Sequence, residues 1–554
     1  MKTLKQEYDV IIIGGGATGA GTARDCALRG LKVLLVERQD FTAGATGRNH
    51  GLLHSGARYA VTDSESAAEC IRENRILRRI ARHCVEDTGG LFITLPEDSL
   101  EYQATFVDAC LRAGIGAEVI DPAEARRIEP SVNPTLTGAV KVPDGAIDPF
   151  RLTTANIIDA RRHGADVLTY HEVTALLRHG NVVEGVELRH NRTGEMMRAF
   201  GHIVINAAGI WGHLVAKKAG VEVNMFPAKG SLLIFGHRVN NTVINRCRKP
   251  ANADILVPGD TICLIGTTSD RVPFSEIDNM EVTPGEVDIL ISEGEKLAPS
   301  LRNTRILRAY AGVRPLVADD NDPSGRSISR GIVCLDHSER DGLDGFITIT
   351  GGKLMTYRLM AEEATGMACR KLGAGDRPCT TATTPLPGSE GPVLPEKSSS
   401  GWRSRKHIIE LPTEQLAAES RHGDLAGDID WNNPDGGGTL VCECEQVSAG
   451  EVNFAIDKLH VHNLVNLRRR TRLGMGTCQG QLCACRAAGL LENSGRCAAE
   501  ALDDLCGFIN ERWKGMYPVA WGETAAEIQF TSWLYEGVAG LDQWRKDRNE
   551  TTEK

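Results

Sequence analysis

Four cysteines near the C-terminus are spaced to bind a metal. Cys442 and Cys444 form a C-x-C pair, and Cys478 and Cys483 follow further along the chain as a C-x4-C pair. Four thiolates gathered from two short loops can hold a zinc ion or an iron–sulfur cluster. The spacing alone does not decide between them, although structural zinc sites more often use C-x-x-C pairs. Cys485 offers a second choice for the fourth ligand.

A glycine-rich turn near the N-terminus is typical of a dinucleotide-binding site. Residues 14–19 read GGGATG and match the pattern G-x-G-x-x-G. In that pattern Gly14 allows the tight turn, Gly16 lets the backbone approach a pyrophosphate, and Gly19 lets the helix pack on the strand. Glu37, about 20 residues on, can accept hydrogen bonds from ribose hydroxyls. The sequence contains no second such motif, so we expect no separate NAD(P) site.

The elements that must position this motif are those of a β-α-β unit. Residues 8–13 (YDVIII) predict a buried strand, because β-branched residues dominate the run. Residues 17–29 predict a helix that stops at Gly30, and residues 31–36 predict a second strand. The N-terminus of the helix would supply free N–H groups and a positive dipole end to the phosphates.

Segments far along the chain return to the same domain. Residues 42–59 are dense in small and polar residues, which suits a loop and a helix start lying against a large flat cofactor. A strand is expected over 203–207, and another over 345–350 meets a glycine pair before a helix over 354–372. A return after so long an interruption predicts a nucleotide domain into which a substrate domain is inserted.

Length and composition limit the remaining choices. At roughly 100–200 residues per domain, 554 residues suggest two to four domains. Apolar residues at 41% and charged residues at 25% exclude a disordered, collagen-like or coiled-coil chain. A net charge of −10 argues against nucleic-acid binding. No apolar run reaches the ~18–20 residues that a transmembrane helix needs, so we expect a cytoplasmic protein with reduced cysteines.

Four motifs make the first 385 or so residues similar to the FAD-dependent glycerol-3-phosphate dehydrogenases, within the glycine/D-amino-acid-oxidase-like group. They are GGGATG at 14–19, HSGARY at 54–59, AYAGVRPLV at 309–317 and GFITITGGKLMTYR at 345–358. With its C-terminal cysteines, the whole chain resembles the anaerobic members of that family. The resemblance implies oxidation of sn-glycerol 3-phosphate to dihydroxyacetone phosphate, with hydride transfer to FAD.

Cationic side chains inside these motifs are the implied substrate ligands. By the resemblance, Arg58 and Arg314 hold the phosphate and hydroxyl end of the substrate, and a guanidinium fork suits bidentate binding of phosphate. Lys353 is expected at the flavin edge, where a positive charge would stabilise the reduced anionic flavin. Tyr59 and Thr356 are expected as further substrate contacts.

The general base and the cofactor contacts complete the implied site. His54 is the candidate base for the C2 hydroxyl proton, with His50 as the alternative. The expected FAD contacts come from the glycine motif, the acid after the second strand and the returning segments. They are Gly14, Gly16, Ala17, Thr18, Gly19, Glu37, Thr46, Gly51, Val173, Ala208, Gly209, Gly351, Gly352, Lys353, Leu354 and Met355.

The C-terminal cysteines resemble those of the bacterioferritin-associated-ferredoxin-like [2Fe–2S] domain. The similar region covers about 438–495, with a helix expected over 448–459 between the two cysteine pairs. The resemblance favours a [2Fe–2S] cluster over zinc, and Cys483 over Cys485 as the fourth ligand. A one-electron cluster beside a two-electron flavin would let electrons leave singly toward a membrane quinone.

Partners follow from the same resemblance. The family works as a complex with two further subunits, one of them membrane-anchoring, so we expect this chain on the inner face of the cell membrane without a span of its own. Four of the seven Trp lie in the last 50 residues, which suits either a partner interface or the packing of a helical tail. The basic run 468–472 (RRRTR) could neutralise the cluster, dock a partner or form a solvated face.

These observations predict one domain organisation. The fold class is α/β: a Rossmann-like FAD-binding domain interrupted by an α+β substrate domain, then a small iron–sulfur domain and a helical tail. The expected bounds are 1–385 for the flavin enzyme (FAD-binding segments about 1–80, 150–220 and 330–385), 386–437 for a linker, 438–495 for the [2Fe–2S] domain and 496–554 for the tail.

Two other functions compete with this interpretation. An amino-acid or sarcosine oxidase-like flavoenzyme would share the nucleotide domain, but it would not need the cysteine module. A non-catalytic, zinc-bearing nucleotide-binding scaffold would use the same four thiols for structure alone.

Overall fold

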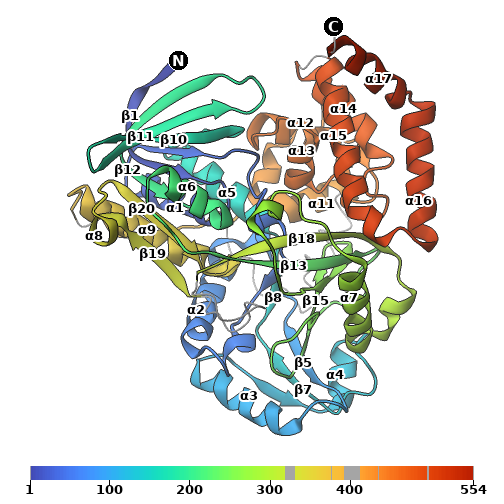
Figure 1. Cartoon of the computed structure of the whole chain (residues 1–554). Coiled ribbons are helices and arrows are strands. Elements are labelled where there is room, and N and C mark those ends of the chain that lie inside the picture. The colour runs from blue at the N-terminus through green and yellow to red at the C-terminus, as the bar shows by residue number, and fades with distance from the viewer. Residues whose placement is uncertain are drawn as a thin grey trace.

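Three separate stretches of the chain build the first sheet (Figure 1). The computed structural model describes residues 2–317, 331–375, 377–391, 412–433, 436–495 and 498–552. The strand order is β10–β11–β12–β1–β2–β9; β20 pairs with the end of β12, and β19 pairs with β20. The strands are β1 (Lys2–Ile13), β2 (Val33–Val36), β9 (Asp166–Leu168), β10 (His171–His179), β11 (Val182–His190), β12 (Met196–Asn206), β19 (Ile332–Asp336) and β20 (Phe346–Gly351).

The centre of this sheet is parallel, as a dinucleotide-binding fold requires. β1 pairs in parallel with β12 and β2, β9 is parallel to β2, and β20 is parallel to β12. Helix α1 (Ala17–Leu28) packs between α5 (Pro149–Arg162) and α9 (Tyr357–Lys371). The predicted helices over 17–29 and 354–372 are confirmed, the second as a 3-10 turn η7 (Leu354–Thr356) followed by α9.

The intervening residues build a second sheet. Its order is β17–β13–β16–β15–β14–β5–β7–β6, and β18 also pairs with β13. These strands are β5 (Gly90–Thr94), β6 (Glu118–Ile120), β7 (Gly138–Val142), β13 (Phe226–Phe235), β14 (Val243–Arg246), β15 (Ile255–Gly259), β16 (Ile262–Gly266), β17 (Asp270–Arg271) and β18 (Ile306–Leu316). The predicted fold class, a nucleotide domain interrupted by a second α/β unit, is therefore confirmed.

Shorter elements complete these two units. A small sheet, β3–β8–β4, comprises β3 (Leu52–Leu53), β8 (Gly145–Ile147) and β4 (Val85–Glu86). The remaining helices are α2 (Ser64–Ile80), α3 (Leu100–Arg112), α4 (Pro122–Ile128), α6 (Gly212–Lys218), α7 (Pro284–Leu297) and α8 (His337–Asp341), with short 3-10 turns that include η1 (Ala45–Gly47), η2 (Ala57–Tyr59) and η4 (Gly209–Trp211).

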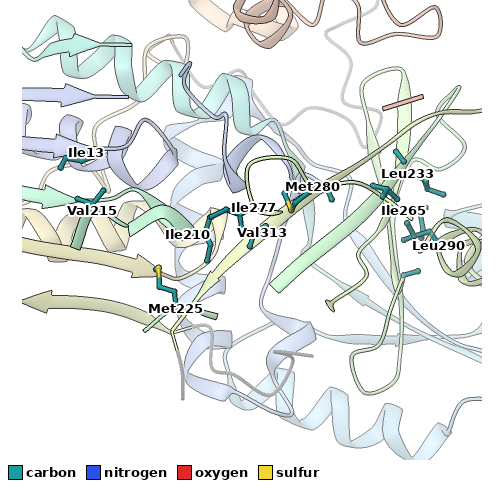
Figure 2. Close-up of a cluster of buried hydrophobic side chains, with 14 of the residues drawn as sticks. Ile13, Ile210, Val215, Met225, Leu233, Ile265, Ile277, Met280, Leu290 and Val313 are labelled. Atoms are coloured by element: carbon teal, nitrogen blue, oxygen red, sulfur yellow. The ribbon is translucent and has the colours of Figure 1, made fainter. Parts of the chain in front are cut away.

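One continuous apolar core joins the two sheets. It runs from Ile13 at the end of β1, through Ile210 and Val313, to Leu233 and Leu290 on the second sheet and α7 (Figure 2). All five side chains are at most 6% exposed. Because interiors are packed at crystal-like density, this core fixes β18 relative to the nucleotide motif.

The C-terminal residues form a helical module that lies against the first two units, in orange and red in Figure 1. It contains the pair β21 (Leu440–Cys442) and β22 (Val447–Ser448) and helices α11 (Thr413–His422), α12 (Ala449–Lys458), α13 (Leu464–Thr471), α14 (Cys483–Asn493), α15 (Ala498–Met516), α16 (Gly522–Ser532) and α17 (Leu541–Thr552). The helix expected over 448–459 is confirmed as α12.

Part of the predicted linker belongs to this module. Residues 413–422 form α11, where Arg421 and His422 both bond the buried carboxylate of Glu451, at 2.5 and 2.8 Å. A buried charge needs such partners, so α11 is part of the folded module and the linker interpretation is wrong for these residues. Residues 392–411 and 434–435 of the same stretch lie outside the described residues.

Candidate functional site

The glycine motif forms a tight loop between β1 and α1. Gly14 has φ +117°, and a Cβ there would lie 2.6 Å from the carbonyl oxygen of Ala207. A Cβ on Gly19 would lie 1.9 Å from the carbonyl oxygen of Gly14, so only glycine lets α1 approach the loop. Helix α1 starts without a side-chain N-cap and without an acidic residue in its first turn. This end of the helix is suited to the phosphates of a dinucleotide.

Glu37 lies at the end of β2 beside this loop. Its carboxylate accepts hydrogen bonds from the backbone N–H of Gly15 at 2.7 Å and of Gln39 at 2.8 Å. Burial raises the pKa of Glu37, although both hydrogen bonds oppose the rise. The same contacts fix the carboxylate where a ribose would lie, and its remaining lone pairs can accept from the ribose hydroxyls.

The predicted site residues line one cavity of about 1130 Å³ between the two sheets. The cavity starts at the glycine motif and extends to the second sheet. Those that line it are Gly14, Gly16, Ala17, Thr18, Glu37, Thr46, His54, Arg58, Tyr59, Val173, Ala208, Gly209, Arg314, Gly351, Gly352, Lys353, Leu354 and Met355. Four motifs that are far apart in the sequence therefore meet at one place, as an extended cofactor and its substrate require.

Three predicted residues lie outside this lining. Gly19 packs against Gly14, as described above, and supports the loop from behind. Gly51 lines a neighbouring cavity. Its φ is +68°, and its backbone lies so close to the carbonyl oxygen of Ile147 that a Cβ would not fit. The Thr356 hydroxyl is buried and is engaged by the backbone of Lys353, at 2.9 Å to its nitrogen and 3.1 Å to its oxygen. Neither Gly51 nor Thr356 is among the residues that line this cavity.

Arg314 projects from β18 into the cavity. Its guanidinium donates to the carbonyl oxygens of Lys229 at 3.3 Å and Thr268 at 3.0 Å, and to the hydroxyls of Thr267 and Ser269. These neutral acceptors hold the planar fork in one orientation without adding a negative charge. The motif did not reveal residues 267–269, because nothing in the run TTS distinguishes it from an ordinary loop.

Arg58 approaches from the 3-10 turn η2. It forms an ion pair of 3.1 Å with Asp254, whose side chain is fully buried, and its Nη1 is buried with no hydrogen-bond partner among the described residues. An orphaned donor of this kind fits an anionic ligand. Asp254 was missed by sequence reasoning, because a lone acid after Ala253 carries no pattern.

Lys353 and His54 lie close to Arg58. The Lys353 ammonium lies over the Tyr59 ring, 4.6 Å from its centroid. The cavity is therefore lined at one place by a positive charge and an aromatic face. The His54 ring lies 5.5 Å from the Tyr59 ring and 5.7 Å from the His50 ring. Both histidines line the cavity, so the choice between them as general base stays open on geometry.

The four predicted metal ligands come together as two pairs of thiols. Cys442 shares a side-chain hydrogen bond with Cys483, and Cys444 shares one with Cys478. The hydrogen bond from Cys478 lowers the pKa of Cys444 to about 5. Cys485, by contrast, points to solvent. The four-thiol donor set fits an iron–sulfur cluster and leaves Cys485 out of it.

Within the described ranges, no three Cys, His, Asp or Glu side chains are arranged to hold a single metal ion. A pair of thiols on either side matches the two irons of a [2Fe–2S] cluster better than one tetrahedral zinc.

Three arginines of the basic run 468–472 are held by acids of this chain. Arg469 and Arg470 form ion pairs with Asp40 at 3.0 and 2.6 Å, and Arg472 forms ion pairs with Asp260 and Glu445, both at 3.0 Å. Asp40 and Asp260 belong to the flavin-domain side, so these arginines dock the cysteine module onto it. The expectations of a solvated face and of a partner site are therefore wrong for Arg469, Arg470 and Arg472, because acids of this chain bind all three.

Taken together, the loop, the acid and the cavity define an FAD-dependent oxidoreductase, and comparison with known proteins agrees. Residues 9–358 match the family described as FAD dependent oxidoreductase, and residues 440–493 match the BFD-like [2Fe-2S] binding domain. More specifically, the chain belongs to the family of the anaerobic glycerol-3-phosphate dehydrogenase A subunits. FAD and a [2Fe–2S] cluster are thus its cofactors, and both fit the residues described above.

Individual relatives cover nearly the whole chain. The A subunit of the anaerobic glycerol-3-phosphate dehydrogenase of Escherichia coli K12 is 63% identical over 99% of this chain and 100% of its own. The A1 subunit of the Haloferax volcanii enzyme is 42% identical over 98% of this chain and 92% of its own. The FAD complex of glycerol-3-phosphate dehydrogenase from Bacillus halodurans shares the fold, with a TM-score of 0.68, 21% identity and coverage of 92% and 95%.

Across the ranges that the structure describes, no helix combines the length and apolar character needed to cross a lipid bilayer.

Proposed function

We propose that the protein oxidises sn-glycerol 3-phosphate to dihydroxyacetone phosphate, with FAD accepting the hydride. The observation that carries this proposal is the convergence of Arg58, Arg314 and Lys353 on the cavity of the nucleotide motif. A phosphorylated polyol needs cationic ligands beside the flavin, whereas an amino-acid substrate carries no phosphate. The relatives are named for glycerol 3-phosphate, which supports the same substrate.

The chain's own residues have distinct tasks in this proposal. Arg314 and Arg58 bind the substrate phosphate, the first oriented by neutral acceptors and the second by Asp254. Lys353 would supply positive charge to the bound flavin and so would favour its reduced anionic form. His54 takes the C2 hydroxyl proton, with His50 as the alternative.

The electrons would leave through the thiol-bound cluster toward partner subunits and a membrane quinone. We place the chain on the inner face of the membrane, held there by two further subunits, one of which is membrane-anchoring. Trp521 and Trp533 are 50% and 62% exposed, whereas Trp513 and Trp544 pack on the module core. The exposed pair is therefore our candidate for a partner contact. Replacing both with serine should release the partners; an intact complex would refute this contact.

The domain bounds belong to the proposal as well. We assign residues 1–385 to the flavin enzyme, 438–495 to the [2Fe–2S] domain and 496–554 to the tail, and we add α11 to the cysteine module because Glu451 holds it there.

The decisive experiment is anaerobic. The purified holoenzyme should show flavin bleaching with sn-glycerol 3-phosphate and reduce a dye acceptor. Arg314→Ala should raise the KM by about 10-fold to 100-fold, since hydrogen bonds to a charged group contribute about 1.5–3 kcal/mol each. Arg271→Ala is the matched control, because Arg271 lies exposed on β17, which pairs with the same strand β13. Wild-type affinity in Arg314→Ala would exclude the phosphate assignment, and no dye reduction by the wild type would exclude the substrate.

A further inference from the structure

Three arginines other than Arg58 and Arg314 line a second cavity. This cavity of about 2740 Å³ lies between the flavin domain and the cysteine module. Arg48 follows η1, Arg308 lies on β18, and Arg468 lies on α13; helix α15 contacts both β18 and α13. All three arginines line the cavity together with Glu511 of α15.

The geometry of β18 explains why they meet. Side chains alternate along a strand, so residues 308, 310 and 312 share one face. The Tyr310 hydroxyl donates to the carbonyl oxygen of Asn49 at 2.8 Å, and a Cβ on Gly312 would lie 2.9 Å from the Cβ of Arg48. The loop carrying Arg48 is therefore packed on the face of β18 that also bears Arg308.

Among the described residues, these three guanidiniums have no carboxylate in an ion pair, unlike the other arginines of the run 468–472. Arg469, Arg470 and Arg472 are all in ion pairs, as described above. Over the part of the chain that the structure describes, Arg48, Arg308 and Arg468 form none, and Nε of Arg308 and of Arg468 is buried without a hydrogen-bond partner. Arg308 is only 9% exposed and reaches the main-chain oxygen of Glu511 at 3.4 Å.

The carboxylates near these arginines define their electrostatic surroundings. Glu511 is the carboxylate that interacts with all three, while Asp278, near Arg48, is paired with Arg38 at 2.6 Å. One carboxylate is thus shared by three guanidiniums. Desolvation lowers the pKa of each of the three guanidiniums, so their charged forms are disfavoured at this place. The two buried Nε atoms without a hydrogen-bond partner among the described residues, those of Arg308 and Arg468, are therefore suited to an anionic acceptor.

We propose that Arg48, Arg308 and Arg468 form a second phosphate-binding site, separate from the Arg58/Arg314 site. Arginine forks whose buried donors have no partner within the described ranges match the oxygens of a phosphate group. Arg48, Asn49 and His50 line both cavities, so the new site adjoins the flavin cavity. The ligand is a phosphate group, either of the substrate on its way to the flavin or of free inorganic phosphate; the first source rests on the proposed function.

The test is equilibrium dialysis of the holoenzyme with radiolabelled inorganic phosphate at low ionic strength, without turnover. The double variant R308Q/R468Q should bind one phosphate fewer per chain than the wild type, and each single variant should bind that phosphate about tenfold more weakly. R238Q is the matched control, because Arg238 lines the same cavity but is paired with Glu86 at 2.6 Å. It should retain the wild-type stoichiometry.

A second variant keeps the test independent of folding. R314A, in which the three arginines are intact, should still bind one phosphate; no binding by R314A would overturn the proposal. So would an unchanged stoichiometry in R308Q/R468Q with full FAD and iron content. Loss of dye reduction by the wild type would overturn the proposed function alone, because the dialysis does not depend on turnover.

Kinetics then distinguish the two sources of phosphate. If the site holds the substrate in transit, added salt should lower kcat/KM less in R308Q/R468Q than in the wild type, because steering is screened by salt. If it holds free phosphate, added phosphate should change the rate at saturating substrate in the wild type only. If neither kinetic effect is seen and the phosphate stoichiometry is also unchanged, the site is refuted.

Discussion

Glu286 is buried behind Arg314, the arginine that we propose binds the substrate. Replacing Glu286 should therefore weaken substrate binding at Arg314. It lies in the first turn of α7, accepts hydrogen bonds from Lys229 at 2.8 Å, Ser231 at 2.6 Å and Thr268 at 3.2 Å, and forms a capping box with Thr283. The Thr268 carbonyl in turn accepts from Arg314. Glu286 is thus a positioning residue for the substrate-binding loop.

The expected loss in the free energy of unfolding follows from the burial of the Lys229–Glu286 ion pair. Lys229 and Glu286 have side chains only 9% and 10% exposed, and removing one partner of a buried pair costs about 3–5 kcal/mol. Glu286→Gln keeps the size and two polar atoms, so we expect about 3 kcal/mol, the lower end of that range. The KM for sn-glycerol 3-phosphate should rise while kcat changes little, because loop 267–269 orients the binding fork.

The pH dependence of stability gives a second readout. Burial opposes ionisation of Glu286, but the hydrogen bonds from Lys229 and Ser231 outweigh it and lower its pKa. A lowered pKa stabilises the fold above the ordinary value of about 4.3, and this stabilisation is lost as the pH falls through the folded value. The variant should therefore lose less stability on acidification than the wild type.

The assay combines urea unfolding with steady-state kinetics. Asp288→Asn is the control, because Asp288 lies on the exposed side of the same helix. A Glu286→Gln protein with wild-type unfolding free energy and wild-type KM would refute the reasoning, and so would an equal effect of Asp288→Asn.

Three further predictions concern the cofactors and the module interface. Asp40→Asn should destabilise the docked module by about 3–5 kcal/mol, because it removes the buried partner of two arginines on α13; limited proteolysis that releases no C-terminal fragment would contradict this. Cys483→Ser should lose the iron–sulfur absorption and the bound iron, whereas Cys485→Ser should keep both. The reverse result would make Cys485 the fourth ligand in place of Cys483. Gly19→Ala should lose FAD, since a Cβ would lie 1.9 Å from the carbonyl oxygen of Gly14; a wild-type flavin content would contradict the packing.

Local patterns in the sequence predicted local structure well. The turn at Gly14, the helix after it and the acid at Glu37 depend on neighbours that are close in the chain, so their types and order sufficed. The helix expected over 448–459 came from the resemblance to the ferredoxin-like domain, and the structure has it as Ala449–Lys458.

The misinterpreted segments depend on contacts that are distant in the chain. Arg470 looked like part of a solvated run because nothing near it in sequence shows that Asp40 will bury it. Helix α11 looked like linker because its partner Glu451 lies well beyond it, on α12. Thr356 lies inside a matching motif, yet its hydroxyl bonds the backbone of Lys353, a detail of turn geometry that residue type does not encode.

Docking of the cysteine module by buried ion pairs has a kinetic consequence. Asp40 and Arg470 have side chains 3% and 0% exposed, and pairs shielded from solvent are little affected by salt. The module is therefore held at one distance from the flavin and does not swing on a tether to find it. Electron transfer between the two centres should be a first-order step, with a rate independent of protein concentration and viscosity.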